Sequence, residues 1–236
     1  MRPRSPVRRG ALHVIALALA VAIAIDQPAF AACSEADAPA RIAFLQQSFA
    51  LDAAPARRWT LWWTIGFGAL TIGQAVPAPF VDKATRIDFL VGAVSSAASV
   101  VYTLLTPLSA GSADRRFAAI VHAGGDGCAI AAKGRAILAD AADGEAGGRG
   151  WLAQTLNVVF NAVVALWLGL GYGHWLSALE SGVGGLALGE IMILTQPDGL
   201  PARLAAYDAG SFHAATDAPR VSLVLAPRYV GVSVAF

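Results

Sequence analysis

Residues 151–170, WLAQTLNVVFNAVVALWLGL, contain no charged side chain. An α-helix needs about 20 residues of this kind to cross the hydrocarbon core of a bilayer. Three other stretches of the 236-residue chain are similarly poor in charge. The four apolar blocks are residues 59–81, 89–113, 151–179 and 181–197. This layout predicts a protein embedded in lipid.

The overall composition favours the same class. Hydrophobic residues make up 56% of the chain and charged residues 14%, whereas soluble domains carry about 25% charged residues. The formal net charge is +1, so no basic excess points to nucleic acid as a partner.

The first 31 residues have the features of a secretory signal peptide. Four arginines within the first nine residues precede an apolar run over residues 11–25. Ala29 and Ala31 then supply small residues at the −3 and −1 positions of a cleavage site. We therefore expect export from the cytoplasm. Two alternatives are an uncleaved anchor and a lipoprotein acylated at Cys33.

The chain has two cysteines, Cys33 and Cys128, and both lie outside the apolar blocks. In an oxidising compartment they are expected to form a disulfide, which requires both on the same side of the membrane. The alternative is two unrelated thiols.

The length of the apolar blocks favours helices over strands. Strands of a transmembrane barrel need only about 9–11 residues, about half the length of these blocks. The predicted fold is an all-α membrane protein with four transmembrane helices arranged as two hairpins. Alternation over residues 229–236 adds a short C-terminal β-hairpin with residues 221–225. An outer-membrane β-barrel is the alternative.

The predicted organisation follows from these segments. It comprises a signal peptide (1–31), an extracytoplasmic segment (32–58), a first transmembrane hairpin (59–107), a soluble helical interlude (108–150), a second transmembrane hairpin (151–197) and an extracytoplasmic tail with β-strands (198–236). A short amphipathic helix is expected over residues 40–50, separated from the first span by Pro55. Within the interlude, a turn at residues 124–127 precedes a helix expected to end near Ala142.

Two signals of orientation conflict. Export of the N-terminus places residues 32–58 and the interlude outside the cytoplasm. Only Lys83 and Arg86 then lie in the cytoplasmic connections, which opposes the positive-inside rule. The arginines that fall outside are Arg57, Arg58, Arg115, Arg116, Arg149 and Arg203.

Glu190 is the main candidate for a functional side chain, because it falls in the middle of the fourth block. A charged carboxylate at mid-bilayer costs a few kcal/mol, so it needs a partner or a proton. Asn157 and Asn161 are spaced to offer that partner from the third span, and Gln74 is a further candidate. Glu190 either relays protons or cations, or makes an interhelical hydrogen bond.

Glycines at a spacing of four residues predict close helix packing. Gly185 and Gly189 form one such step, and Gly169 and Gly173 form another. Removing side chains from one helix face lets two backbones approach.

No motif predicts catalysis, a metal or another cofactor. The histidines lack metal-ligand spacing, and no phosphate loop or nucleophile elbow occurs. A membrane enzyme remains a hypothesis only if Asp88, His174 and Glu190 converge on one cavity.

The expected function is that of a non-enzymatic structural or interaction component of the bacterial cell envelope, in the inner membrane rather than the outer. Its expected partners are the lipid bilayer and either further copies of itself or other envelope proteins. The alternative is a small transporter or channel subunit that uses Glu190.

Overall fold

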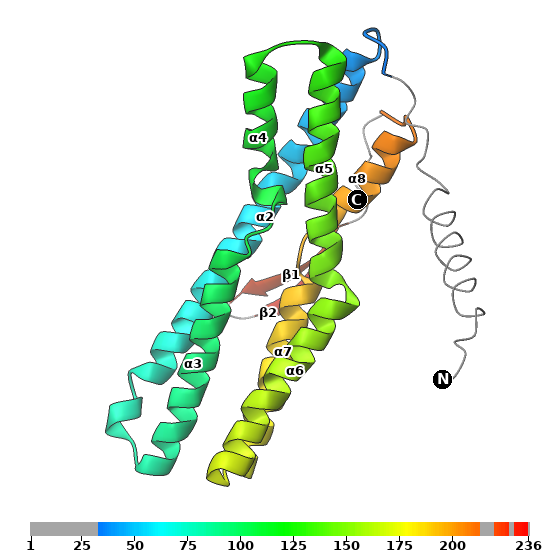
Figure 1. Ribbon diagram of the computed structural model, residues 1–236. Coiled ribbons are helices and arrows are strands. Elements are labelled where there is room, and N and C mark those ends of the chain that lie inside the picture. The colour runs from blue at the N-terminus through cyan, green and yellow to red at the C-terminus, as the bar shows by residue number, and fades with distance from the viewer. Residues whose placement is uncertain (1–32, 213–219, 227–228, 236) are drawn as a thin grey trace, which may run out of the picture.

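The computed structural model of this protein describes residues 33–212, 220–226 and 229–235 (Figure 1). Its elements are α2 (Ala38–Ala75), the 3-10 turn η1 (Ala78–Phe80), α3 (Lys83–Leu105), α4 (Ala110–Ala123), α5 (Gly127–Arg149), α6 (Trp151–Leu166), the π-helical turn η2 (Trp167–Gly171), α7 (Trp175–Leu194), α8 (Gly199–Asp208), β1 (Arg220–Ala226) and β2 (Tyr229–Ala235). Strands β1 and β2 pair antiparallel. The predicted signal peptide lies outside the described residues.

The described chain is helical and of membrane type. Three helical stretches are long and apolar enough to cross a membrane, namely Lys83–Ala123, Trp151–Gly171 and Trp175–Asp208. Within the described residues, strands occur only as β1 and β2. The barrel alternative is therefore wrong.

Helices α4, α5 and α8 lie toward one end of the molecule and α3, α6 and α7 extend to the other (Figure 1), and the two ends have opposite burial patterns. We call residues 33–58, 110–150 and 199–212 the bundle; its largest apolar side chains lie inside, with Leu45 and Phe117 at most 1% exposed. We call residues 59–105 the first hairpin and 151–194 the second. Their large apolar side chains lie outside, among them Trp62, Ile72, Leu105, Leu156, Leu170 and Leu176. An apolar exterior of this extent is typical of a surface that faces lipid.

Helix α2 joins the bundle to the first hairpin without a break. The prediction of a separate amphipathic helix that ends before Pro55 was wrong, because α2 continues through this residue to Ala75. Ala53 and Ala56 are almost completely buried on either side of the proline. Arg57 also donates to the Gly111 carbonyl oxygen of α4 at 2.9 Å. These tertiary contacts outweigh the local helix-breaking effect of proline.

The interlude and the tail are more helical than predicted. Helix α4 precedes the turn, and α5 continues past Ala142 to Arg149. Gly148, six residues past the expected end, lies inside α5 against the side chain of Gln196. Helix α8 was not predicted, because Pro197 and the following residues read as a stop; it begins at Gly199.

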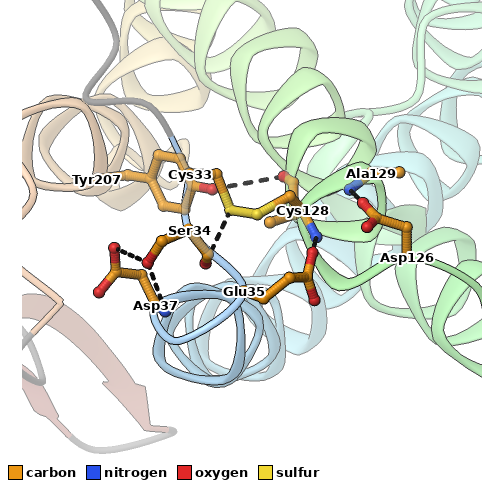
Figure 2. Close-up of a disulfide and its surroundings, with 9 residues drawn as sticks. Cys33, Ser34, Glu35, Asp37, Asp126, Cys128, Ala129 and Tyr207 are labelled. Atoms are coloured by element: carbon orange, nitrogen blue, oxygen red, sulfur yellow. Dashed lines mark hydrogen bonds between the residues drawn. A yellow bond between two sulfur atoms is a disulfide. The ribbon is translucent and has the colours of Figure 1, made fainter.

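The predicted disulfide between Cys33 and Cys128 is present (Figure 2). It ties the chain just before α2 to the first turn of α5. Because its sulfur is used in this bond, Cys33 cannot carry the thioether lipid of a lipoprotein. Nearby, Glu35 accepts a hydrogen bond from the Cys128 backbone nitrogen at 3.4 Å.

We predict that Cys33→Ser and Cys128→Ser destabilise the bundle equally, by about 4 kcal/mol, because the bond closes a loop of 95 residues. The measurement is thermal unfolding followed by circular dichroism in detergent. The double substitution should cost no more than either single one, since all three remove the same bond. Additive losses would contradict this account.

A buried ionic cluster joins α2, α5 and α8 where the bundle meets the hairpins. Arg203 Nε lies 3.2 Å from Asp52 Oδ2, and both side chains are less than a tenth exposed. Glu145 Oε2 accepts a hydrogen bond from the Leu200 backbone nitrogen at 2.9 Å. Its other oxygen, Oε1, has no hydrogen-bond partner among the described residues. Burial, reinforced by the negative charges of Asp52 and Asp198, raises the pKa of Glu145 from 4.5 to about 7.

This raised pKa predicts a pH-dependent bundle. The neutral carboxyl favours the folded state, so stability is greatest below pH 4.5 and declines as the pH rises through about 7, by about 3 kcal/mol in all. Glu145→Gln should abolish this decline in unfolding experiments between pH 5 and pH 8. Asp143→Asn, which alters an exposed carboxyl of the same helix, should leave it unchanged. An unaltered pH profile in E145Q would contradict the assignment.

Candidate functional site

The second hairpin contains a cluster of amide and carboxyl side chains. Asn157 Nδ2 donates to Glu190 Oε1 at 2.8 Å, from α6 to α7. With its amide nitrogen turned toward Glu190, Gln154 donates to the two carboxylate oxygens at 2.7 and 2.8 Å. Asn161 Nδ2 in turn donates to Asn157 Oδ1 at 2.9 Å. The carboxyl of Glu190 is thus held by two amide donors on the neighbouring helix.

Two glycines of α7 make room for this cluster. A side chain at Gly185 would collide with the Asn161 amide, and one at Gly189 with the Asn157 amide. The Gly-x-x-x-Gly step at these positions therefore serves contact within one chain. It brings α7 close enough for α6 amides to reach its backbone, as in the bond from Asn157 Nδ2 to the Leu186 carbonyl oxygen at 3.2 Å.

Glu190 lies nearer the end of its helix than the predicted span placed it. Helix α7 begins at Trp175, six residues before the predicted span, and ends at Leu194. Glu190 is therefore one turn from the helix end, about 6 Å along the axis. At that end, the Trp63 indole nitrogen lies 3.3 Å from Thr195 Oγ1, as expected of aromatic residues near a membrane surface.

Three other predicted residues have different surroundings. Gln74 donates to Ser96 Oγ at 3.3 Å within the first hairpin, so it is not a partner of Glu190. Gly169 lies against the Trp175 ring and does pack between segments. Gly173 has φ of +75° and forms the turn before α7, so its predicted role in helix packing was wrong.

A second polar cluster links the two hairpins at their far end. His174 Nδ1 lies 2.6 Å from Asp88 Oδ1, and Ser177 Oγ donates to Asp88 Oδ2 at 2.7 Å. Asp88 belongs to α3, whereas His174 and Ser177 lie at the start of α7. Beside this contact, Val91 of α3 packs with a small apolar cluster that includes Leu168.

A shallow pocket of about 300 Å³ opens at this second cluster and is lined by Asp88, His174 and Ser177 among others. Glu190 does not line this pocket. It lies 16 residues after His174, about 24 Å away along the axis of α7. The three residues proposed for a membrane enzyme therefore do not converge on one cavity.

The bonds of both clusters join neighbouring helices, α6 with α7 in the first and α3 with α7 in the second. Both oxygens of Asp88 are occupied, by an imidazole and a hydroxyl. Nowhere in the described residues do three or more His, Cys, Asp or Glu side chains gather as a metal site would require. Asp88 and His174, which the sequence had named together, do meet, whereas Ser177 was missed because it lies 89 positions from Asp88 in the chain.

No protein-family model, curated protein or solved structure matches this chain.

The Asn157–Glu190 contact predicts coupling between the two side chains. In a double-mutant cycle of Asn157→Ala and Glu190→Ala, measured by unfolding in mixed detergent micelles, we expect a coupling energy of about 1 kcal/mol. A cycle of Asn157→Ala with Gln74→Ala should be additive, because the two amides share no partner. Equal coupling in both cycles would contradict the assigned bond.

Proposed function

We propose that this protein is a non-enzymatic component of the bacterial inner membrane, in which two transmembrane hairpins hold the disulfide-closed bundle on the extracytoplasmic side. The bundle is the part that contacts other envelope components, and the tail with β1 and β2 lies on the same side. The observation that carries the proposal is that the polar side chains in the hairpins are bonded mainly to one another.

The proposal requires a fourth span, made by residues 59–75 of α2. Because α2 begins in the bundle and α3 returns to it, the chain must cross the same thickness twice. Tryptophan and threonine lower the hydropathy of this half of α2, but the threonine hydroxyls and the indole nitrogens of Trp59 and Trp63 have partners. Thr64 Oγ1 donates to the Thr60 carbonyl oxygen at 2.8 Å and lies 3.0 Å from Thr103 Oγ1 of α3. These bonds support its placement in lipid.

The disulfide supports the orientation, since such bonds persist in an oxidising compartment. The six arginines that fall outside the cytoplasm, against the positive-inside rule, are largely paired with acidic side chains. Aspartate partners lie within 3.2 Å of four of them, in the pairs Arg57–Asp114, Arg116–Asp140, Arg149–Asp198 and Arg203–Asp52. Folding outside the cytoplasm thus leaves little unpaired positive charge there.

Bonds within the chain also favour anchoring over transport. A relay needs a carboxyl that can exchange protons along a path, whereas Glu190 is held by the amides of Gln154 and Asn157. Asp88 is held in the same way at the opposite end. Each cluster joins neighbouring helices, which is the role expected of buried polar side chains in membrane proteins.

The orientation is tested with cysteines introduced at Ala132 of α5 and Ala84 of α3, both exposed. In intact cells, a membrane-impermeant maleimide should label Ala132→Cys and should reach Ala84→Cys only after the membrane is permeabilised. Labelling of both from the same side would contradict two complete hairpins. Labelling with the sides exchanged would contradict the orientation.

The role is tested by two measurements on the full chain. In proteoliposomes, proton and potassium flux should not exceed that of empty liposomes, and Glu190→Gln should change nothing. A photo-crosslinking residue at exposed Ala119 or Ala132 of the bundle should give discrete protein adducts in cells, whereas one at lipid-facing Val101 should not. Flux that depends on Glu190, or the absence of bundle adducts, would contradict the proposal.

A further inference from the structure

One carboxyl of the hairpins differs from the others. Glu180 lies in the second turn of α7, and its side chain is exposed. It makes no hydrogen bond or ion pair within the described residues, whereas Asp88, His174 and Glu190 are all bonded inside the chain. It is also about one turn deeper in the helix than Ser177, which bonds Asp88. An ionisable side chain that faces lipid is costly, and such residues normally face protein.

The surroundings of Glu180 form one continuous face of α7. Leu176, Glu180, Val183 and Ala187 recur at intervals of four, three and four residues, the spacing of a heptad seam. All four are exposed. This face points away from α6, because Gly185 and Gly189 mark the opposite side, against Asn161 and Asn157.

The same face is open enough for another backbone. Gly184, next to the seam and one turn beyond Glu180, is exposed, and a Cβ placed on it would meet no atom within 4 Å. Ala187 adds a second small side chain. Small residues beside a polar one let two membrane helices approach until the polar groups bond.

We propose that this face of α7 is the contact between two copies of the protein, related by a two-fold axis along the membrane normal, with the two Glu180 side chains bonded to each other. A protonated carboxyl both donates and accepts a hydrogen bond, so it is complementary to itself. Two copies inserted in the same orientation place Glu180 at equal depth, and a two-fold contact satisfies both. The inference rests on the membrane placement proposed above and names one partner of that assembly.

The test measures association of the full chain in phosphatidylethanolamine–phosphatidylglycerol liposomes, by single-molecule photobleaching over a dilution series. The native protein should form dimers. Glu180→Ala should weaken dimerisation about three- to tenfold, the effect of one hydrogen bond in a membrane, whereas Glu180→Gln retains a donor and an acceptor and should dimerise. Monomers at every dilution, or an unchanged E180A, would overturn the proposal.

Two matched pairs of variants distinguish this face of α7 from other lipid-facing surfaces. Gly184→Ile should weaken dimerisation and Gly66→Ile should not, although an added side chain meets open space at both positions. Oxidative crosslinking should join two copies through Ala187→Cys and not through Val94→Cys on the exposed side of α3. Crosslinking through Val94 alone would place the contact elsewhere and refute the α7 interface. Loss of dimers with intact maleimide labelling at Ala132 and Ala84 would reject this inference and leave the anchoring function standing.

Discussion

Hydrocarbon offers no water to a polar group, so each polar side chain in the hairpins needs a partner made of protein. Gln154 and Asn157 supply this for Glu190, and His174 and Ser177 supply it for Asp88. Because each bond joins two helices, the demand for partners also sets how the helices associate. The polar residues that first suggested transport thus act as structural contacts in the proposed assembly.

The bundle obeys the opposite rule, since its large apolar side chains are buried and most of its charged groups face outward or form pairs, with the buried carboxyl of Glu145 as an exception. Helix α2 belongs to both the bundle and the first hairpin, and its unbroken backbone fixes their relative position. The two hairpins contact each other near their ends, through the Trp63–Thr195 pair at one end and Asp88–His174 at the other. Both hairpins extend from the bundle (Figure 1), so the bundle also limits how they can move relative to each other.

Sequence reasoning succeeded where a pattern was local or had one solution. Two cysteines allow one bridge, so the pairing of Cys33 with Cys128 required no knowledge of the fold. It failed where tertiary contacts override local signals, as at Pro55, which α2 accommodates because alanines on both sides are buried. It also missed Ser177 as a partner of Asp88, because 89 positions separate the two residues in the chain.

The sequence by itself determined that this chain is helical and of membrane type, because long uncharged blocks have few other stable states. It also placed Asn157 among the candidate partners of Glu190, beside Asn161 and Gln74, but missed Gln154. Only the tertiary structure decided which carboxyl is enclosed and which is exposed. Glu180 and Glu190 lie ten residues apart on one helix, and their different environments depend on which face α6 covers. That choice arises from contacts between distant segments, which a one-dimensional pattern does not encode.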